Sequence, residues 1–335
     1  MKRLVYSSPF VPAEWIAAHG LRASRLMPRG AVANVSQPAP TMGVCPFADA
    51  FVHAARRDEH ADGVILASAC DQMRRVSEYL TDDLPVFLMH VPTTWQHPGA
   101  FRLYADELER LSGFLVRLGG VRPAPERLAE TMQRFDAARG RLRAAQGHLS
   151  PKAFAEALVR FQHDGALDLD PTDARPRTQG IPLALVGGPL QANHFELFDV
   201  IEAVGGRVAL DATAYGERTL PRPFDRRRLP EEPFGELADA YFGHLPDAFR
   251  RPNNVLYAWL KEAMQRRGIR GILFWHYTWC DTWHAEIERM REWAASLDTP
   301  GSHQKGVPLL AIDASNTSID ARTRSRVQAF VEVLS

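Results

Sequence analysis

The sequence is poor in cysteine, carries no net charge and lacks a long apolar run. Its 335 residues include three cysteines, and an odd number of thiols excludes a complete disulfide framework. Because 40 Lys and Arg balance 40 Asp and Glu, no overall field attracts nucleic acid or an anionic membrane. No apolar stretch reaches the length of a membrane span, and the first ten residues lack the apolar region of a signal peptide. We therefore expect a cytoplasmic protein in a reducing compartment.

Short apolar strands alternate with helical stretches in the first hundred residues. Strands are predicted at residues 2–6, 62–67 and 85–89, and helices at residues 12–19, 47–56 and 71–80. Alternation of this kind is typical of a parallel sheet with right-handed crossovers. We predict an N-terminal α/β domain over residues 1–100.

The next eighty residues break the alternation. Apolar side chains recur at helical spacing over residues 101–118, and similar stretches follow at 126–142 and 152–161. Residues 164–180 are rich in Pro, Asp and Arg, which is typical of a linker. We predict a helical segment and linker over residues 101–180.

The strand and helix pattern then recurs. Strands are predicted at residues 181–186, 207–210, 271–274 and 307–312, and helices at 193–204 and 281–297. Cys70 and Cys280 each follow a strand, precede an Asp and lead into a helix. We therefore predict a second α/β domain over residues 181–335. The fold is expected to be α/β, with two similar Rossmann-like or flavodoxin-like parallel-sheet halves around a helical insert and a site between them.

The cysteines have a functional and a structural interpretation. Open parallel sheets bind ligands at the carboxyl ends of their strands, where Cys70 and Cys280 are predicted to lie. Cys45 precedes the helix at residues 47–56, and a helix N-terminus favours the thiolate that binds metal. Alternatively, all three pack as small apolar side chains. Their wide separation forms no compact motif, and zinc remains an alternative to iron.

Five separated stretches resemble the D-component family of 2-hydroxyacyl-CoA dehydratases, which includes the smaller benzoyl-CoA reductase subunits. In chain order they are residues 12–21 (PAEWIAAHGL), 43–48 (GVCPFA), 69–74 (ACDQMR), 279–286 (WCDTWHAE) and 323–332 (TRSRVQAFVE). Each stretch alone is a weak signal. Together they span nearly the whole chain in the order that the family has.

The resemblance implies an oxygen-sensitive [4Fe–4S] cluster bound by Cys45, Cys70 and Cys280, with one iron site open. It implies a radical lyase reaction, in which one electron reduces an acyl-CoA thioester and the 2-hydroxyl is eliminated. The implied partners are an ATP-dependent activator protein and a homologous second subunit or a second copy of this chain. The sequence has no phosphate-binding loop of its own, so ATP would be hydrolysed by the activator.

Several other interpretations stay open. The chain could be a subunit of an aryl-CoA reductase of the benzoyl-CoA type, or a non-catalytic subunit that relays electrons. It could also be a two-lobed small-molecule binding protein whose cysteines only pack.

Five further side chains are candidates for the same site. Glu14 and His276 are expected to be catalytic, and Ser7, Ser8 and Trp279 to bind substrate, because they lie near predicted strand ends. The alternatives are structural: the serines cap a helix, Glu14 suits a first helical turn, and His276 is a core histidine. The aromatic run at residues 274–279 is expected to form a loop that walls the site.

Overall fold

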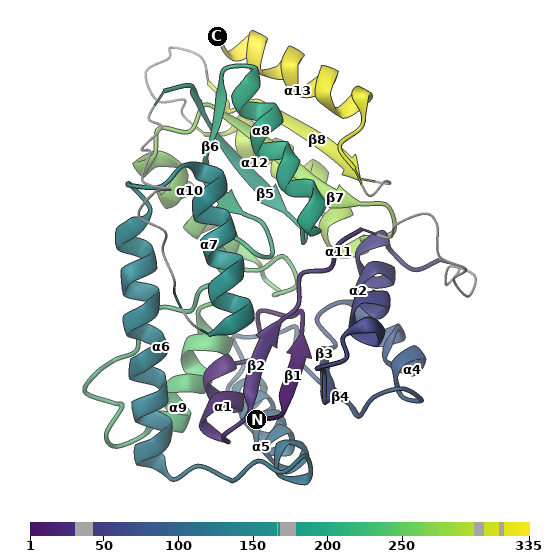
Figure 1. Ribbon diagram of the computed structural model, residues 1–335. Coiled ribbons are helices and arrows are strands. Elements are labelled where there is room, and N and C mark those ends of the chain that lie inside the picture. Colours follow the sequence, from purple (N-terminus) through teal and green to yellow (C-terminus); the bar gives the residue numbers. More distant parts are fainter. Residues whose placement is uncertain (31–42, 166, 168–178, 298–304, 315–317) are drawn as a thin grey trace.

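The protein consists of two α/β halves joined by long helices. The computed structural model describes residues 1–30, 43–165, 167, 179–297, 305–314 and 318–335. Strands β1 to β4 form one unit and β5 to β8 the other, with α6 (Pro125–Ala145) and α7 (Pro151–Asp164) along one side (Figure 1). No helix in the described ranges is long and apolar enough to cross a membrane.

The first sheet is parallel and has the strand order β2-β1-β3-β4. Its strands are β1 (Arg3–Tyr6), β2 (Arg22–Arg25), β3 (Gly63–Ala67) and β4 (Val86–Met89). All of β3 is buried, as is typical of a parallel strand with helices on both faces. Leu4 and Ile65 pack with helices on one face, whereas Val5 and Val64 pack on the other.

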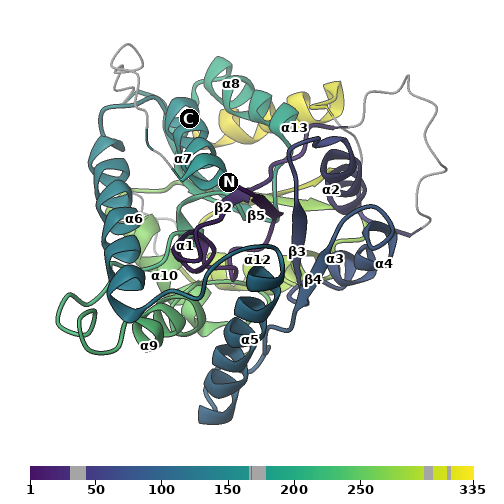
Figure 2. The same ribbon diagram turned by 60° about the horizontal axis from the view of Figure 1, so that its bottom comes forward.

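The helices around this sheet supply the two packed faces. The face with Leu4 meets α1 (Ala13–Ala18) and α5 (Pro98–Arg117). The face with Val5 meets α2 (Pro46–Arg57) and α4 (Ser77–Leu80). Figure 2 shows α2 and α4 on one side of the sheet and α1 and α6 on the other.

The second sheet repeats the arrangement of the first. Its order is β6-β5-β7-β8, again fully parallel. The strands are β5 (Ile181–Gly187), β6 (Gly206–Ala212), β7 (Gly271–Tyr277) and β8 (Leu309–Ala314), and the helices include α8 (Glu196–Ala203), α10 (Asn254–Arg266), α12 (Ile287–Ala295) and α13 (Ala321–Leu334). In both halves the first strand lies between the second and the third. The prediction of two similar parallel α/β halves is confirmed.

The two halves share packed surfaces. The core around α1 and α5 includes Phe224 and Leu237, which come from the second half of the chain. Leu237 lies in α9 (Pro233–Ala238), which is followed by the π-helical turn η4 (Asp239–Gly243). Helix α7 contacts both β2 and β6. The domain boundaries at residues 100 and 180 stay a prediction, and most of the predicted linker lies outside the described residues.

The elements differ from the predicted ones in three ways. Strand β2 and helices α9 and α10 were not predicted. The helix predicted at residues 71–80 is two short helices, α3 (Asp71–Arg75) and α4, and residues 281–297 likewise hold α11 (Asp281–His284) and α12. Strand β7 runs on to Tyr277, so most of the aromatic run is buried strand and not loop.

Gly187 lets β5 and β7 approach each other where both strands end. Its backbone is in the positive-φ region at 147°, and a Cβ atom there would lie 1.9 Å from the carbonyl oxygen of Trp275. We expect Gly187→Ala to lower the free energy of unfolding by about 3 kcal/mol, as overpacking against backbone does, measured by denaturant titration.

Gly140 provides the matched control. It lies inside α6, and a Cβ atom there would meet nothing within 4 Å. Gly140→Ala should raise the free energy of unfolding by roughly 0.5–1 kcal/mol. Equal stability of the two variants would contradict the close approach at Gly187.

Candidate functional site

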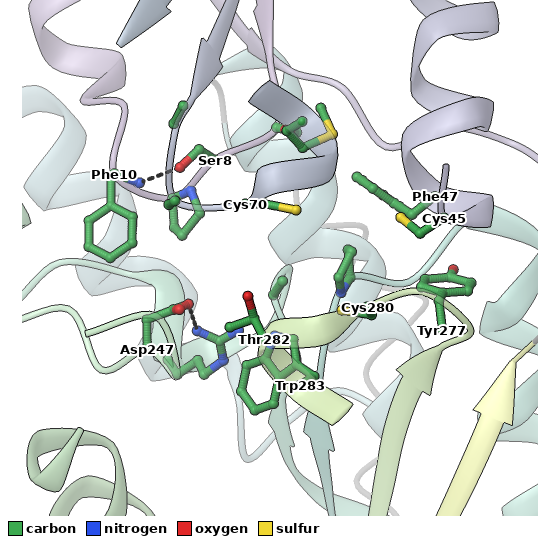
Figure 3. Close-up of a pocket in the computed structure, with 18 residues that line it drawn as sticks. Ser8, Phe10, Cys45, Phe47, Cys70, Asp247, Tyr277, Cys280, Thr282 and Trp283 are labelled. Atoms are coloured by element: carbon green, nitrogen blue, oxygen red, sulfur yellow. Dashed lines mark hydrogen bonds and ion pairs between the residues drawn. The ribbon is translucent and has the colours of Figure 1, made fainter. Parts of the chain in front are cut away.

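A cavity lies between the two halves, at the carboxyl ends of their strands. Its volume is about 100 Å³, and its lining is mostly apolar. The first half contributes Ser8, Phe10 and Phe47, and the second contributes Tyr277 and Trp283 (Figure 3). This is the position where open α/β sheets bind ligands.

All three cysteines line this cavity. Cys45 precedes α2, Cys70 precedes α3 and Cys280 precedes α11, and each is the N-cap residue of its helix. Figure 3 shows the three thiols around one space, with Cys45 and Cys70 on one side and Cys280 on the other. Residues up to 235 positions apart, from 45 to 280, therefore meet at one place.

Burial controls the protonation of these thiols. It raises the pKa of each one, to about 12 for Cys280. Proximity to Cys70 raises the pKa of Cys45 and Cys280 further, while backbone N–H groups act in the opposite direction. The sequence suggested that helix N-termini would favour thiolate, but in the metal-free chain burial outweighs them. A bound metal would have to displace the protons.

The three thiols determine which metal group the cavity could hold. No group of three or more His, Cys, Asp or Glu side chains in the described ranges is arranged to hold one metal ion. Thiolates on one zinc ion would have to lie about 4 Å apart, given a Zn–S bond of about 2.3 Å. A cluster accepts wider spacing, because each thiolate binds a different iron. Three soft donors in an apolar wall fit an iron–sulfur group.

The polar side chains of the cavity belong to the serine turn and to one ion pair. Ser7 and Ser8 line the cavity, as does Thr282. The Ser8 hydroxyl accepts a hydrogen bond from the Phe10 N–H at 3.3 Å. Arg218 and Asp247 pair at 2.6 Å in the opposite wall. Arg218 lies in the 3-10 turn η3 (Glu217–Thr219) and Asp247 in an irregular loop, so no periodic pattern marked this pair.

The other three candidate residues do not line the cavity. Glu14 is fully buried, where it pairs with Arg139 and accepts a hydrogen bond from the Tyr241 hydroxyl at 2.7 Å. His276 is 5% exposed, and burial lowers its pKa. Trp279 is 61% exposed and has a left-handed backbone with φ at 67°. Of the five non-cysteine candidates, Ser7 and Ser8 are thus the two that line the same cavity as the thiols.

The ion pair of Glu14 generates a prediction about stability. Glu14→Gln removes the carboxylate and leaves the Arg139 guanidinium, which is 1% exposed, without its main partner. We expect the free energy of unfolding to fall by about 3–5 kcal/mol, the cost of breaking a buried pair. Glu130→Gln, at an exposed position of α6, is the control and should change it by less than about 0.5 kcal/mol. Native stability of Glu14→Gln combined with lost turnover would favour a catalytic role.

Comparisons with solved structures give only distant similarities. A crystal structure of a substitution variant of SsGBP has a TM-score of 0.28 and 10% identity, over 100% of this chain and 98% of that chain. A crystal structure of SsGBP with GDP has a TM-score of 0.27 and 12% identity, over 100% of both chains. These values are too low to support an inference about function. No curated protein matches the sequence.

A protein-family comparison gives a clear result. The model of the 2-hydroxyglutaryl-CoA dehydratase D-component family matches residues 9–334. The match includes all three cysteines and both sheets apart from the first strand. With this coverage of nearly the whole sequence, the chain belongs to the 2-hydroxyglutaryl-CoA dehydratase D-component family.

Proposed function

We propose that this chain is the cluster-bearing component of an ATP-activated enzyme that eliminates the 2-hydroxyl of an acyl-CoA thioester. Cys45, Cys70 and Cys280 would hold a [4Fe–4S] cluster. One observation carries the proposal: the only three thiols of the chain come from three helix N-termini in two halves and line one apolar cavity. Membership of the dehydratase family supports it.

The cavity wall would protect the reaction from water. When bound, the cluster would supply one electron and an open iron site for the thioester carbonyl. Phe10, Phe47, Met73 and Trp283 surround the thiols with apolar surface, which would exclude water that competes with substrate. This apolar wall is the contribution that the protein itself would make.

The serine turn would orient the substrate. Because the Ser8 oxygen accepts from the Phe10 N–H, its own hydrogen is free to be donated to a substrate oxygen. Ser7 holds the turn in place, since its carbonyl accepts from Arg25 at 2.8 Å. Trp279 lies outside the cavity lining, so we propose that it contacts the part of the CoA thioester that stays outside.

Glu14 and His276 are better suited to positioning than to direct catalysis. Neither lines the cavity. Glu14 holds α6 through Arg139 and the turn η4 through Tyr241. His276 lies in β7 four residues before Cys280, where its ring packs against His284 of α11. We propose that both support the loops that carry the thiols.

The proposal requires each cysteine for cluster binding. We expect the anaerobically reconstituted native chain to be brown, with about four iron and four sulfide per chain. Cys45→Ser, Cys70→Ser and Cys280→Ser should each lose most of this iron, because a hydroxyl is a poorer ligand than thiolate for iron–sulfur centres. Iron and sulfide analysis with absorption spectra would measure the loss.

Met73→Leu is the matched control for the cysteine variants. Met73 lines the same cavity and also contains sulfur, but its thioether forms no thiolate. This variant should bind as much iron as the native chain. Full cluster content in any of the three serine variants would contradict the assignment of that ligand.

Turnover distinguishes the dehydratase from an electron relay. With an ATP-dependent activator and a homologous second subunit present, the native chain should dehydrate a 2-hydroxyacyl-CoA, and Ser8→Ala should lower the rate by roughly tenfold or more through the lost hydrogen bond. A relay subunit would accept electrons from the activator, and the native chain and Ser8→Ala would then support the same rate of turnover.

The product of the reaction, assayed by mass spectrometry, would distinguish dehydration of a 2-hydroxyacyl-CoA from ring reduction of an aryl-CoA.

A further inference from the structure

Three buried arginines surround the cysteine cavity. Arg25, Arg218 and Arg250 are 3%, 1% and 3% exposed. Arg25 comes from β2, Arg218 from the 3-10 turn η3 and Arg250 from a loop of the second half. Charged side chains are almost never fully buried unless they are paired. For each arginine, the negative charge that balances it therefore has to be identified.

Each arginine reaches the cavity wall. Arg25 donates to the carbonyl oxygens of Ser7 and Ala214, which both line the cavity. Arg218 is itself part of the lining. Arg250 lies 5.9 Å from the ring centre of Phe10, another lining residue.

Of the three arginines, only Arg218 forms an ion pair within the described ranges. Asp247 pairs with Arg218 at 2.6 Å. None of the ion pairs in the described ranges involves Arg25, whose side-chain partners are the neutral Gln162 and Thr219. The buried carboxylate Glu14 is paired with Arg139.

Arg250 also has no ion-pair partner among the residues that the structure describes. It donates to the Phe242 carbonyl and lies among aromatic rings, 4.2 Å from the ring centre of Phe242 and 5.6 Å from that of Trp95. Burial lowers its pKa to about 10, so it stays protonated at neutral pH. Within the described ranges, Arg25 and Arg250 are thus two buried guanidinium groups without an ion pair, whereas Arg218 has Asp247.

An unpaired buried cation is costly unless an anion lies within its field. A cluster held by three thiolates is anionic, and it becomes more negative when it accepts an electron. We propose that Arg25 and Arg250 are fixed counter-charges for the group held by Cys45, Cys70 and Cys280, and that they raise its reduction potential. This inference rests on the proposed function and adds to it the residues that tune electron uptake.

The midpoint potential of the reconstituted full chain tests the inference. Dithionite titration followed by electron paramagnetic resonance would compare the native chain with Arg25→Gln and Arg250→Met. Each variant removes one charge, and Met keeps an apolar side chain among the three rings around residue 250. At a fixed potential we expect the ratio of reduced to oxidised cluster to fall about tenfold in each variant, which is about 59 mV for one electron.

Two controls separate charge from packing. Arg25→Lys keeps the charge. At the same fixed potential, its ratio of reduced to oxidised cluster should lie within a few-fold of the native ratio. Arg110→Gln removes a guanidinium that also lies over a ring, 4.4 Å from the centre of Phe87, but its side chain is 47% exposed and paired with Glu107. That variant should leave the potential unchanged, because solvent screens the charge.

The outcomes distinguish this inference from the proposed function. A native chain that binds no cluster would overturn both. A native chain that binds the cluster, with unchanged potentials in Arg25→Gln and Arg250→Met, would overturn the counter-charge role alone. If Arg25→Gln fails to fold, the shift in Arg250→Met decides the inference.

Discussion

Arg25 connects the two halves of the molecule through buried hydrogen bonds. It extends from the end of β2 and donates to Ser7 of its own half and to Ala214 and Thr219 of the other. Nearby, the Tyr215 hydroxyl donates to the Leu26 carbonyl and the Gln191 side chain to the Pro46 carbonyl. These buried hydrogen bonds leave the strand ends of both sheets facing one space. The convergence of the three thiols depends on that arrangement.

The sequence predicted the part of the fold that periodicity encodes. Apolar runs at β1, β3, β5 and β7 marked the central strands, and the repeated Cys-Asp step revealed the internal similarity. Strand β2 escaped detection because two of its four residues are arginines. Arg25 is buried through Ser7 and through three partners that lie more than a hundred residues away. The end of β7 was placed too early, since aromatic side chains suit both a strand and a wall of a ligand site.

The site was predictable where chemistry is tied to local context. Each cysteine precedes a helix, and the residues just after β1 line the same cavity, so Cys45, Cys70, Cys280, Ser7 and Ser8 could be placed together from sequence. Glu14 shows the limit of that reasoning: its position near a predicted strand end suggested catalysis, but its partners come from α6 and from the turn η4. Arg218 lies in one short 3-10 turn, and Asp247 and Arg250 lie in a loop without periodicity. Only tertiary structure brings these residues to the cavity.

The central claim is that one group bridges the two halves through three thiolates. An anaerobic crystal structure of the reconstituted chain, with anomalous diffraction recorded on both sides of the iron absorption edge, tests it most directly. The account predicts iron density in the cavity, within bonding distance of the sulfur atoms of Cys45, Cys70 and Cys280. Iron bound elsewhere, a zinc signal in its place, or three free thiols in a chain that retains enzymatic turnover would contradict it.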